Sequence, residues 1–566
     1  MIARTIKACI SSVVKELGLP KVAFSLEHPS DFSHGDYSSN LALILSKETG
    51  TPPRELAEDI VKKLHERGVK ELKKVEVAEP GFINFFLSPD FLVEQVAHII
   101  THGHEWGRNT SLEGKRVIVE YTDPNPFKVF HIGHLMPNVI GESLSRLFEY
   151  AGAEVKRANY QGDIGLHVAM ALWGMQQSDK LKMIIPDEEA PLSQKVAFMG
   201  AAYALGAQAH KEDEKAKSAI KQINKAIYNR TDSHINDLYD RGKKWSLDYF
   251  ETLYVKLGTE FDYYFFESKA AERGKNLVEE NPEVFEESKG AIVFPGEKHG
   301  LHTRVFLTSE GLPTYEAKEL GLAEMKYEAF PYDISVVVTA NEVTEYFKVL
   351  IEALRQINPE LSRRTRHIPH GLLRLRTGKM SSRTGDVLPA EELIKDAETA
   401  VAEKMEGVKK DKVTEKIAVG AIKYSILKQA IGKDVIFDRE RALSLEGDSG
   451  PYLQYAYTRA QSVLKKAKRE GVDINASSSS PKAITEVEQM LYQFPEVVMR
   501  AEEEYAPHLV VTYLTKLAGA FNSWYAKEKI LDGTSEVPYK LALTKAVSVT
   551  LENGLWLLGI KVPEEM

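Results

Sequence analysis

Two histidines, His131 and His134, flank Gly133 at the start of an amphipathic stretch, where they could bind phosphate. The free N–H groups of a helix amino terminus attract anions, and histidines there can donate to phosphate oxygens. Gly133 lacks a Cβ, so a flat base or a ribose could approach the backbone. Alone this motif proves little, because a histidine at a helix start is more often a cap or a packed surface residue than a catalyst.

A second stretch, GKMSSRTGD at residues 378–386, closes a region rich in positive charge. Residues 363–383 carry many arginines and Lys379 without a single acid, interleaved with leucines. A charge run is usually a solvated face, but this one ends in a loop bounded by glycines. That pattern favours a cationic flap over phosphate.

The histidines must be positioned by a strand and a turn. The β-branched run Val117–Val119 ends at an acid, Glu120, and a proline-rich turn leads to the histidines. Pro137 fits only the first turn of a helix, so we place the helix start at the histidines. Strand, helix and a further strand at residues 154–159 predict half of a doubly wound nucleotide fold, with its ligands at the carboxyl ends of the strands. Asp163 also falls at that edge.

The fold class expected is multidomain α/β with a doubly wound parallel sheet. Strand patterns near Gly290 and at residues 334–339 are expected to complete that sheet, and the last strand leads into the GKMSS loop. We expect four segments: a small α+β domain at 1–110, the Rossmann-like domain at 111–395 with a helical insertion at about 170–290, a helical linker at 396–444, and a helical bundle at 445–566.

The amino-acid composition limits the kinds of protein that this chain can be. The chain has 566 residues, 43% of them hydrophobic and 27% charged, which is ordinary for a globular protein, and no apolar run approaches the roughly 20 residues of a membrane span. Cys9 is the only cysteine, which excludes internal disulfides and a cysteine-rich zinc site and suits the cytoplasm. A net charge of −9 argues against bulk electrostatic coating of nucleic acid, so an RNA partner needs local patches.

The pair HIGH and KMSS, about 250 residues apart, resembles the two signatures of class I aminoacyl-tRNA synthetases, and the surrounding phrases resemble arginyl-tRNA synthetases. The likeness covers nearly the whole chain, in order: GDYSSNLAL, GFINFFL, EYTDPNPFKVFHIGH, LPTYEAKELGLA, GKMSSRTGD, LEGDSGPYLQYAYTRA and LLGIKVPEEM. The resemblance implies a ligase that activates L-arginine with ATP to arginyl-adenylate and pyrophosphate, then transfers arginine to the 3′ end of its tRNA.

The resemblance also implies which residues bind ATP. Positioning and positive charge should dominate, because phosphoryl chemistry asks little covalent work of side chains. Many class I enzymes have a second lysine where this chain has Ser382, and Arg383 or Lys128 would then supply that charge. The expected catalytic and ATP-binding residues are His131, Gly133, His134, Lys379, Ser381, Ser382 and Lys128.

Arginine specificity should come from acids, because carboxylates grip a planar guanidinium in bidentate fashion. Glu120 is the first candidate and Glu319 the second, at a position where the family usually has aspartate. Asn125 resembles the residue that orients the α-amino group, and Tyr315 would cover the aliphatic stem. The expected arginine-binding residues are Glu120, Asn125, His131, Tyr315, Glu319, Asn341 and Glu342.

The two ends of the chain are expected to bind tRNA. By resemblance the N-terminal domain reads the D-loop, where one sheet face could stack a base, although a helix covering that face is the alternative we favour from pattern alone. The bundle resembles an anticodon-binding domain, with two tyrosines and an arginine on one helix face. The expected contacts are Asn84, Phe86, Tyr452, Tyr455, Arg459, Tyr525 and Met566.

The resemblance also implies the substrates and partners of the protein, and the residues argue against several alternative functions. We expect ATP with Mg²⁺ as substrate, no protein-bound metal, no DNA and no membrane, and the family implies a monomer that activates arginine only with tRNA bound. A cysteinyl enzyme would need zinc-binding cysteines, and a glutamyl or glutaminyl enzyme would want cations around the side chain. A nucleotidylyltransferase such as a pantothenate synthetase leaves both tRNA-binding ends unused, and a non-enzymatic tRNA binder would have lost the histidines or Lys379.

Overall fold

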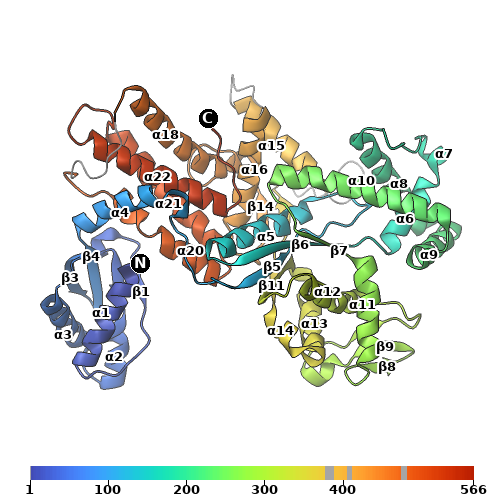
Figure 1. Cartoon of the computed structure of the whole chain (residues 1–566), viewed down its shortest axis with the longest axis horizontal. Coiled ribbons are helices and arrows are strands. Elements are labelled where there is room, and N and C mark those ends of the chain that lie inside the picture. Colours follow the sequence, from blue (N-terminus) through green and yellow to red (C-terminus); the bar gives the residue numbers. More distant parts are fainter. Residues whose placement is uncertain (1, 377–387, 405–410, 473–480) are drawn as a thin grey trace.

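The computed structural model of this chain describes residues 2–376, 388–404, 411–472 and 481–566. A parallel sheet lies at the centre, a small α+β domain and a helical bundle lie on the left in Figure 1, and a group of helices projects to the right. The residues that would form the GKMSS loop, Lys379, Ser381, Ser382 and Arg383, lie outside the described residues. None of the described helices is both long and apolar enough to cross a membrane.

The N-terminal domain packs helices on one face of a four-stranded antiparallel sheet of order β1-β2-β4-β3. Alternation along β4 puts Ile83, Phe85 and Leu87 into the core, as period two requires. On the opposite face Phe82 is 36% exposed and Phe86 partly exposed, so the expectation that a helix covers this face is wrong at these two positions. The elements are α1 (Ile2–Glu16), β1 (Leu26–Glu27), η1 (Phe32–His34), β2 (Tyr37–Ser39), α2 (Leu41–Thr49), α3 (Pro53–Arg67), β3 (Leu72–Ala78), β4 (Phe82–Leu87), α4 (Pro89–His102) and η2 (Gly103–Glu105).

The central sheet has five parallel strands in the order β12-β11-β5-β6-β7. The chain first builds β5, β6 and β7 outward in one direction and then returns to the other side of β5, so strand order reverses between β5 and β11. Ligands of such folds bind at the carboxyl ends of the strands beside that switch point. The elements are β5 (Arg116–Glu120), α5 (Ile132–Tyr150), β6 (Glu154–Gln161), β7 (Tyr263–Phe266), α11 (Glu267–Glu280), α12 (Tyr315–Ala329), β11 (Ile334–Ala340), η4 (Asn341–Val343), α13 (Thr344–Ile357), α14 (Pro359–Arg364) and β12 (Thr365–His370).

Two sequence predictions about this sheet are corrected. The strand patterns near Gly290 form a separate antiparallel sheet of order β10-β9-β8, so only the strand at residues 334–339 joins the parallel sheet. Strand β7 lies inside the range expected to be helical; it is short and aromatic, and its pairing with β6 is a tertiary contact that local pattern does not encode. The small sheet consists of β8 (Glu286–Ser288), β9 (Ala291–Phe294), η3 (Gly296–His299) and β10 (Arg304–Leu307).

The helical insertion has its own core. Phe198 and Trp245 are fully buried in it beside Leu172 and Ile220. Its helices project to the right of the sheet in Figure 1. They are α6 (Leu166–Met175), α7 (Ser178–Leu181), α8 (Leu192–Glu212), α9 (Glu214–Asn229) and α10 (Ser233–Leu257).

The remainder of the chain is mostly helical, as predicted. A short strand pair, β13 with β14, is an addition to that prediction. The elements are β13 (Leu373–Leu375), α15 (Ala390–Lys404), α16 (Asp411–Leu427), β14 (Val435–Phe437), α17 (Arg439–Ala442), α18 (Gly450–Arg469), α19 (Glu486–Leu491), α20 (Phe494–Glu503), α21 (Pro507–Lys527) and α22 (Val537–Leu557).

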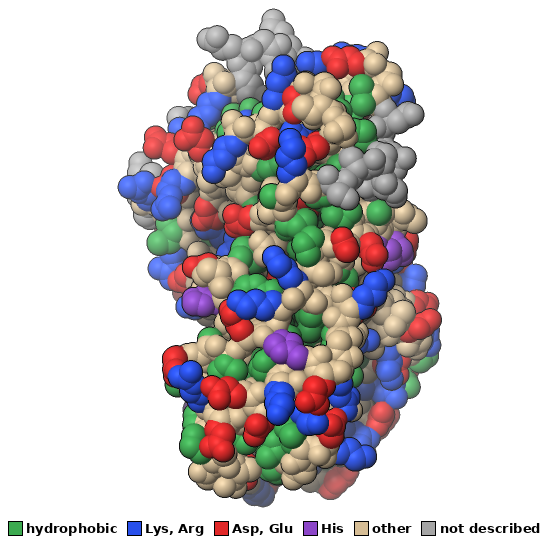
Figure 2. All heavy atoms as spheres, turned by 90° about the vertical axis from the view of Figure 1, so that its left-hand side faces the viewer, with side chains coloured by type: hydrophobic (Ala, Val, Ile, Leu, Met, Phe, Trp, Pro, Cys, Tyr) green, Lys and Arg blue, Asp and Glu red, His purple; other side chains and the backbone are tan. Residues whose placement is uncertain are grey.

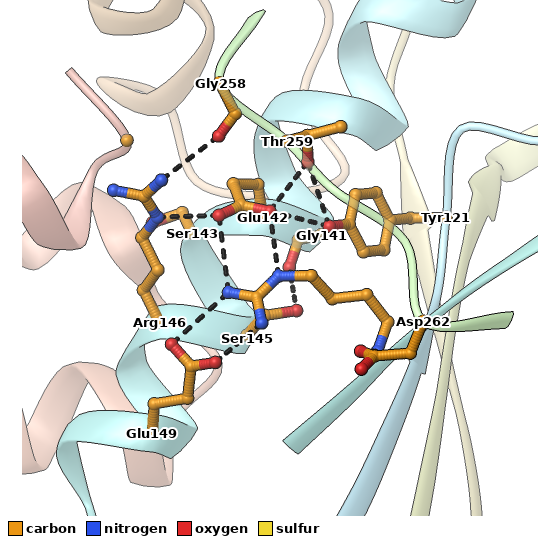
Figure 3. Close-up of polar contacts among 12 residues, drawn as sticks. Tyr121, Gly141, Glu142, Ser143, Ser145, Arg146, Glu149, Gly258, Thr259 and Asp262 are labelled. Carbon is orange, nitrogen blue, oxygen red and sulfur yellow. Dashed lines mark hydrogen bonds and ion pairs between the residues drawn. The ribbon is translucent and has the colours of Figure 1, made fainter. Parts of the chain in front are cut away.

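A buried ion cluster, defined here as Glu142, Glu149, Arg146 and Arg157, fixes α5 (Figure 3). Glu142 accepts from Arg146 Nε at 2.6 Å and from Arg157 Nε at 3.0 Å, while Arg157 Nη1 donates to Glu149 at 2.6 Å. Burial alone would raise the pKa of Glu142, but the two guanidinium charges hold it well below its usual range. Positive and negative charges are equal in number in this cluster.

The same region joins α5 to the end of the bundle. Arg146 Nη1 donates to the Trp556 carbonyl at 2.8 Å, and Ser143 Oγ donates to the Leu557 carbonyl at 2.9 Å. Lys423 Nζ, buried in α16, donates to the Gly559 carbonyl at 2.7 Å. The helix that carries the histidines is therefore attached to the last helix of the chain.

The N-terminal domain also contacts the bundle directly. Tyr37 donates to Glu496 Oε1 at 2.7 Å, and Gln489 Nε2 donates to Asp36 Oδ1 at 3.2 Å. Figure 2 shows the face that these two domains share, with acidic and basic side chains interspersed over the described part of it. The charge on this face is therefore not of a single sign, and binding of RNA through local patches stays a prediction.

Candidate active site at the carboxyl edge of the parallel sheet

The two histidines cap the amino terminus of α5. His131 is the N-cap residue, and its ring nitrogen Nδ1 accepts the Gly133 N–H at 3.1 Å. His134, in the first turn, returns the contact by accepting the His131 N–H at its own Nδ1, also at 3.1 Å. The rings stack with their centroids 3.8 Å apart. A Cβ at Gly133 would lie 2.8 Å from the His131 ring, so the glycine is needed for this arrangement.

These contacts set the protonation of both rings. Each Nδ1 accepts a backbone N–H, so each neutral imidazole carries its proton on Nε2 and can donate from there. Burial and the nearby Lys128 lower the pKa of His131 to about 4, and burial with the neighbouring His131 lowers the pKa of His134 well below its usual range. Burial thus favours neutral histidines, which offer N–H donors but no positive charge. Both histidines cap the helix, and their contact with phosphate stays a prediction.

Pro137 is the sixth residue of α5 and not in its first turn. The prediction of the helix start at the histidines is right, but its reasoning from Pro137 is off by one turn. The proline removes the N–H that would have bonded to the carbonyl of Gly133, four residues earlier.

The turn between β5 and α5 is strained. Thr122, Asp123 and Phe127 have φ values of 84°, 47° and 67°, in the left-handed region that non-glycine residues rarely adopt. The surroundings hold them there: the Phe127 N–H donates to Ser246 Oγ at 2.9 Å, and Asp123 Oδ1 accepts the Tyr160 N–H at 2.8 Å. Strain of this kind concentrates at functional sites.

A cavity of about 300 Å³ opens between the start of α5 and the ends of β11 and β12. Its walls combine the strained turn, the capping histidines and the polar strand ends, which is how a nucleotide site at a switch point is built. The lining residues are Thr122, Asp123, His131, Gly133, His134, Met136, Pro137, Val338, Thr339, Ala340, Glu342, His370, Gly371, Leu372 and Leu373.

An acidic cluster, defined here as Glu120, Asp123 and Glu319, lies at the same edge. Glu120 is 1% exposed and accepts from Lys326 Nζ at 2.5 Å, so the acid expected to grip a guanidinium first is already in an ion pair. Lys326 is on α12, seven residues after Glu319 and hence on the same helix face. The sequence prediction missed this lysine, because no local pattern pairs a residue of α12 with the end of β5.

The other two acids of the cluster have no ion pair among the described residues. Burial and the charge of Glu120 raise the pKa of Glu319 to about 8, and Lys326 and the Tyr315 hydroxyl offset only part of that rise. Burial and Glu120 also raise the pKa of Asp123 well above its usual range. Three carboxyls thus face one lysine in this cluster, which favours a cationic partner.

The remaining candidates are placed as follows. Asn125 lies against Gly162, where a Cβ would come within 2.2 Å of its Oδ1. Lys128 is partly buried, and burial lowers its pKa. Asn341 and Glu342 are exposed in η4, and Glu342 lines the cavity.

Asp163 proves to be a structural residue. It is fully buried and accepts from Lys243 Nζ at 2.7 Å, Tyr239 OH at 2.8 Å and the Ser268 N–H at 2.8 Å. Its oxygens are therefore taken up by the start of α11 and by the insertion.

The predicted D-loop contacts differ in access. Asn84 is 3% exposed, and its side-chain oxygen accepts from Ser38 Oγ at 2.8 Å. Phe86 is partly exposed, and Lys74 Nζ lies 5.1 Å from its ring centroid. Of the two side chains, Phe86 is the more accessible.

In the bundle, three predicted residues come together. The Arg459 guanidinium lies 4.6 Å from the Tyr455 ring and 4.9 Å from the ring of Tyr525, which is 37% exposed. Asn522, which sequence analysis did not single out, accepts from Arg459 at 2.5 Å and fixes its orientation. Tyr452 is partly buried on the same helix, and Met566 packs against the bundle core.

Comparison with known families covers nearly all of the chain. Models described as the class I tRNA synthetase (R) catalytic domain, the DALR anticodon binding domain and the arginyl tRNA synthetase N-terminal domain match residues 95–439, 453–566 and 2–87. An arginine–tRNA ligase of Streptococcus agalactiae is 30% identical over 98% of both chains. One of Pediococcus pentosaceus is 32% identical over 96% of this chain and 95% of its own.

Solved structures give the same picture. The arginyl-tRNA synthetase of Thermus thermophilus superposes with a TM-score of 0.81 at 25% identity over the full length of both chains. That of Plasmodium falciparum, at 20% identity, shares the fold with a TM-score of 0.80 over 100% of this chain and 99% of its own.

The described part of this chain holds no cluster of three or more histidine, cysteine or acidic side chains arranged to bind a metal ion.

Proposed function

This chain belongs to the class I arginyl-tRNA synthetases, whose reaction is the attachment of arginine to tRNA with ATP as substrate, and we propose how its own residues divide that work. The observation that carries the proposal is the junction of two features at one sheet edge. A cavity lined by His131 and His134 lies beside a buried cluster of three carboxyls and one lysine.

ATP is proposed to occupy the cavity of about 300 Å³. His131 and His134 would donate from Nε2 to phosphate oxygens, and Gly133 would let the nucleotide approach the backbone. Lys128 and, from the loop, Lys379, Ser381 and Ser382 would add donors and positive charge around the transferred phosphate. Mg²⁺ is proposed to arrive with ATP and to be held mainly by phosphate oxygens and water.

Arginine is proposed to place its guanidinium at Glu319, with Tyr315 along its aliphatic stem. Glu319 lacks an ion pair among the described residues, whereas Glu120 shares its charge with Lys326. A guanidinium would supply the positive charge that this cluster is short of. Asn125 is proposed to orient the α-amino group, and Asn341 and Glu342 remain candidates at the cavity rim.

Transfer RNA is proposed to contact both ends of the chain. The face of β4 that carries Phe86 and Asn84 would meet the D-loop. The anticodon loop would be met by Tyr452, Tyr455, Arg459, Tyr525 and Met566.

We also propose that the enzyme works as a cytoplasmic monomer. Its four segments are proposed to span residues 1–110, 111–395, 396–444 and 445–566.

The test is ATP–pyrophosphate exchange with the purified protein, with and without arginine tRNA. Glutamate, cysteine and lysine are the control amino acids. Exchange with arginine alone among the four is the expected result, and its dependence on tRNA decides whether activation requires the tRNA. Exchange with another amino acid, or none with arginine under either condition, would contradict the proposed roles of Glu319 and the histidines.

A further inference from the structure

A second pair of histidines lies at the end of α4, outside the candidate active site. His98 and His102 are four residues apart on this helix, so they project from the same face, and both side chains are exposed. Their ring centroids are 3.9 Å apart. Two histidines at this spacing on a helix are a known way to bind a metal ion, because one ion can reach a nitrogen of each ring.

The hydrogen bonds of this pair leave ring nitrogens free to bind a metal. His102 Nδ1 lies 2.9 Å from the carbonyl oxygen of His98, and because a carbonyl only accepts, the neutral His102 ring carries its proton on Nδ1. Its Nε2 is then unprotonated. Neither ring nitrogen of His98 has a hydrogen-bond partner within the described residues. A backbone carbonyl that fixes the tautomer in this way is a usual outer contact of a metal-binding histidine.

The histidines of the candidate active site show the opposite arrangement. The ring centroids of His131 and His134 are 3.8 Å apart, nearly the same separation, but each Nδ1 accepts a backbone N–H. Their protons are therefore on Nε2, and these rings offer N–H donors, which suit an anion. The pair on α4 offers unprotonated nitrogens, which suit a cation.

The position on the helix also favours a positive charge. His102 is the last residue of α4, and His98 lies one turn before it. The last carbonyls of a helix lack partners within the helix and form the negative end of its dipole, so a cation is stabilised beside them. Glu94, one turn before His98, is exposed and adds a negative charge to the same face.

The end of α4 is held in place by the bundle. Asn553 Nδ2, on α22, donates to the carbonyls of Gly103 and Trp106, each at 2.9 Å, and α4 lies beside α22 in Figure 1. The His98 ring contacts the Trp106 ring, with the centroids 5.8 Å apart. An ion bound by the two histidines would therefore lie where the N-terminal domain joins the rest of the chain.

We propose that His98 and His102 bind a divalent transition-metal ion of the kind that imidazole prefers, such as Zn²⁺, through one nitrogen of each ring. Rotation of the two exposed side chains would bring these nitrogens to the roughly 2.0–2.1 Å that a Zn–N bond requires. Water fills the other coordination positions, so the ion is held less tightly than at a structural zinc site with four protein ligands. The site lies outside the candidate active site and does not depend on the proposed function.

The test is a calorimetric titration of Zn²⁺ into the full-length enzyme, prepared without a polyhistidine tag and freed of metal with EDTA. The wild type should show a Zn²⁺ site that His98→Ala and His102→Ala each weaken by roughly tenfold or more, because each variant removes one of the two ligands. Cu²⁺, which imidazole also binds and which quenches nearby tryptophans, should quench Trp106 in the wild type and not in His98→Ala.

His104→Ala is the matched control, because His104 is also exposed and lies two residues after His102, but outside α4. It should bind Zn²⁺ as the wild type does. A wild type without a Zn²⁺ site, or Zn²⁺ binding that is unchanged in both His98→Ala and His102→Ala, would overturn the proposal. An equal loss in His104→Ala would overturn it as well. All three side chains are exposed, and unchanged melting temperatures of the metal-free variants would show that they fold.

Discussion

Two buried charge clusters flank the same strand, β5, and they are built in opposite ways. The ion cluster around Glu142 has two carboxylates and two guanidinium groups, and its arginines hold the pKa of Glu142 well below its usual range. The acidic cluster has three carboxyls and one lysine, and burial with the charge of Glu120 raises the pKa of Glu319 to about 8. Tyr121, next to Glu120 in sequence, donates to Glu142 at 2.7 Å, so the two clusters are neighbours.

The difference separates a structural role from a binding role. Buried ions that neutralise one another stabilise the arrangement of the elements that bear them, and removing one partner is costly. Buried carboxyls without enough cations are unfavourable in the free protein and become favourable when a positive ligand arrives. Charge balance, and not burial alone, is the reason why we propose the acidic cluster, and not the ion cluster, as part of the active site.

The largest expected effect comes from unbalancing the ion cluster. In Glu142→Gln the guanidinium groups of Arg146 and Arg157 lose their shared partner, so the folded protein should lose on the order of 3–5 kcal/mol of stability. Thermal melting with intrinsic fluorescence would report it. Glu149→Gln removes a carboxylate that is more exposed and should cost much less. Equal melting temperatures for Glu142→Gln and the wild type would contradict the structural role.

Removing an acid from the acidic cluster should do the reverse. Glu319→Gln is expected to lower kcat/KM for arginine by roughly 100- to 1000-fold, because a guanidinium loses a charged partner in a buried site. Its melting temperature should stay the same or rise, since one source of repulsion is gone. Steady-state aminoacylation and a melting curve on the same preparation give both numbers. A stability loss with unchanged arginine kinetics would assign Glu319 to the fold.

The raised pKa predicts a pH dependence of arginine binding. The guanidinium prefers ionised Glu319, so arginine affinity should rise by up to about tenfold per pH unit as pH increases toward 8, and level off above it. The free protein should show the opposite trend: a carboxyl that holds its proton more tightly when folded loses its favourable contribution as pH rises from its unfolded pKa through 8. Arginine-induced melting shifts measured from pH 6 to 9 would test both signs, with Glu319→Gln as the flat reference.

The smallest effect is expected outside both clusters. Arg459 stacks between Tyr455 and Tyr525 in the bundle, so Arg459→Ala should raise the KM for tRNA by about tenfold and leave arginine binding unchanged. Lys465→Ala, on the same helix, is the control for a general loss of positive charge. A loss of arginine affinity in Arg459→Ala would show that the bundle contributes to the acidic cluster's function.

Much of the candidate site could be predicted from local sequence patterns, but the balance of charges in the acidic cluster could not. The strand that ends at Glu120 and the helix that starts at the histidines follow from β-branched and amphipathic patterns. The shared face of Tyr455 and Arg459 on α18 follows from helical spacing. The partner of Glu120 is Lys326, 206 residues along the chain, which no local pattern pairs with it. The neutral state of the histidines depends on burial and on reciprocal caps, and β7 depends on its pairing with β6, so these also needed the tertiary structure.

The most direct test of the acidic cluster as the arginine site is proton release on binding. Arginine is titrated into the wild-type enzyme near pH 7.5 in two buffers with different ionisation enthalpies, and the difference in observed heat gives the number of protons exchanged. Because Glu319 is largely protonated in the free enzyme at that pH, binding should release a substantial fraction of a proton, and Glu319→Gln should reduce that release. Arginine binding without proton release, or with proton uptake, would contradict the assignment of the cluster.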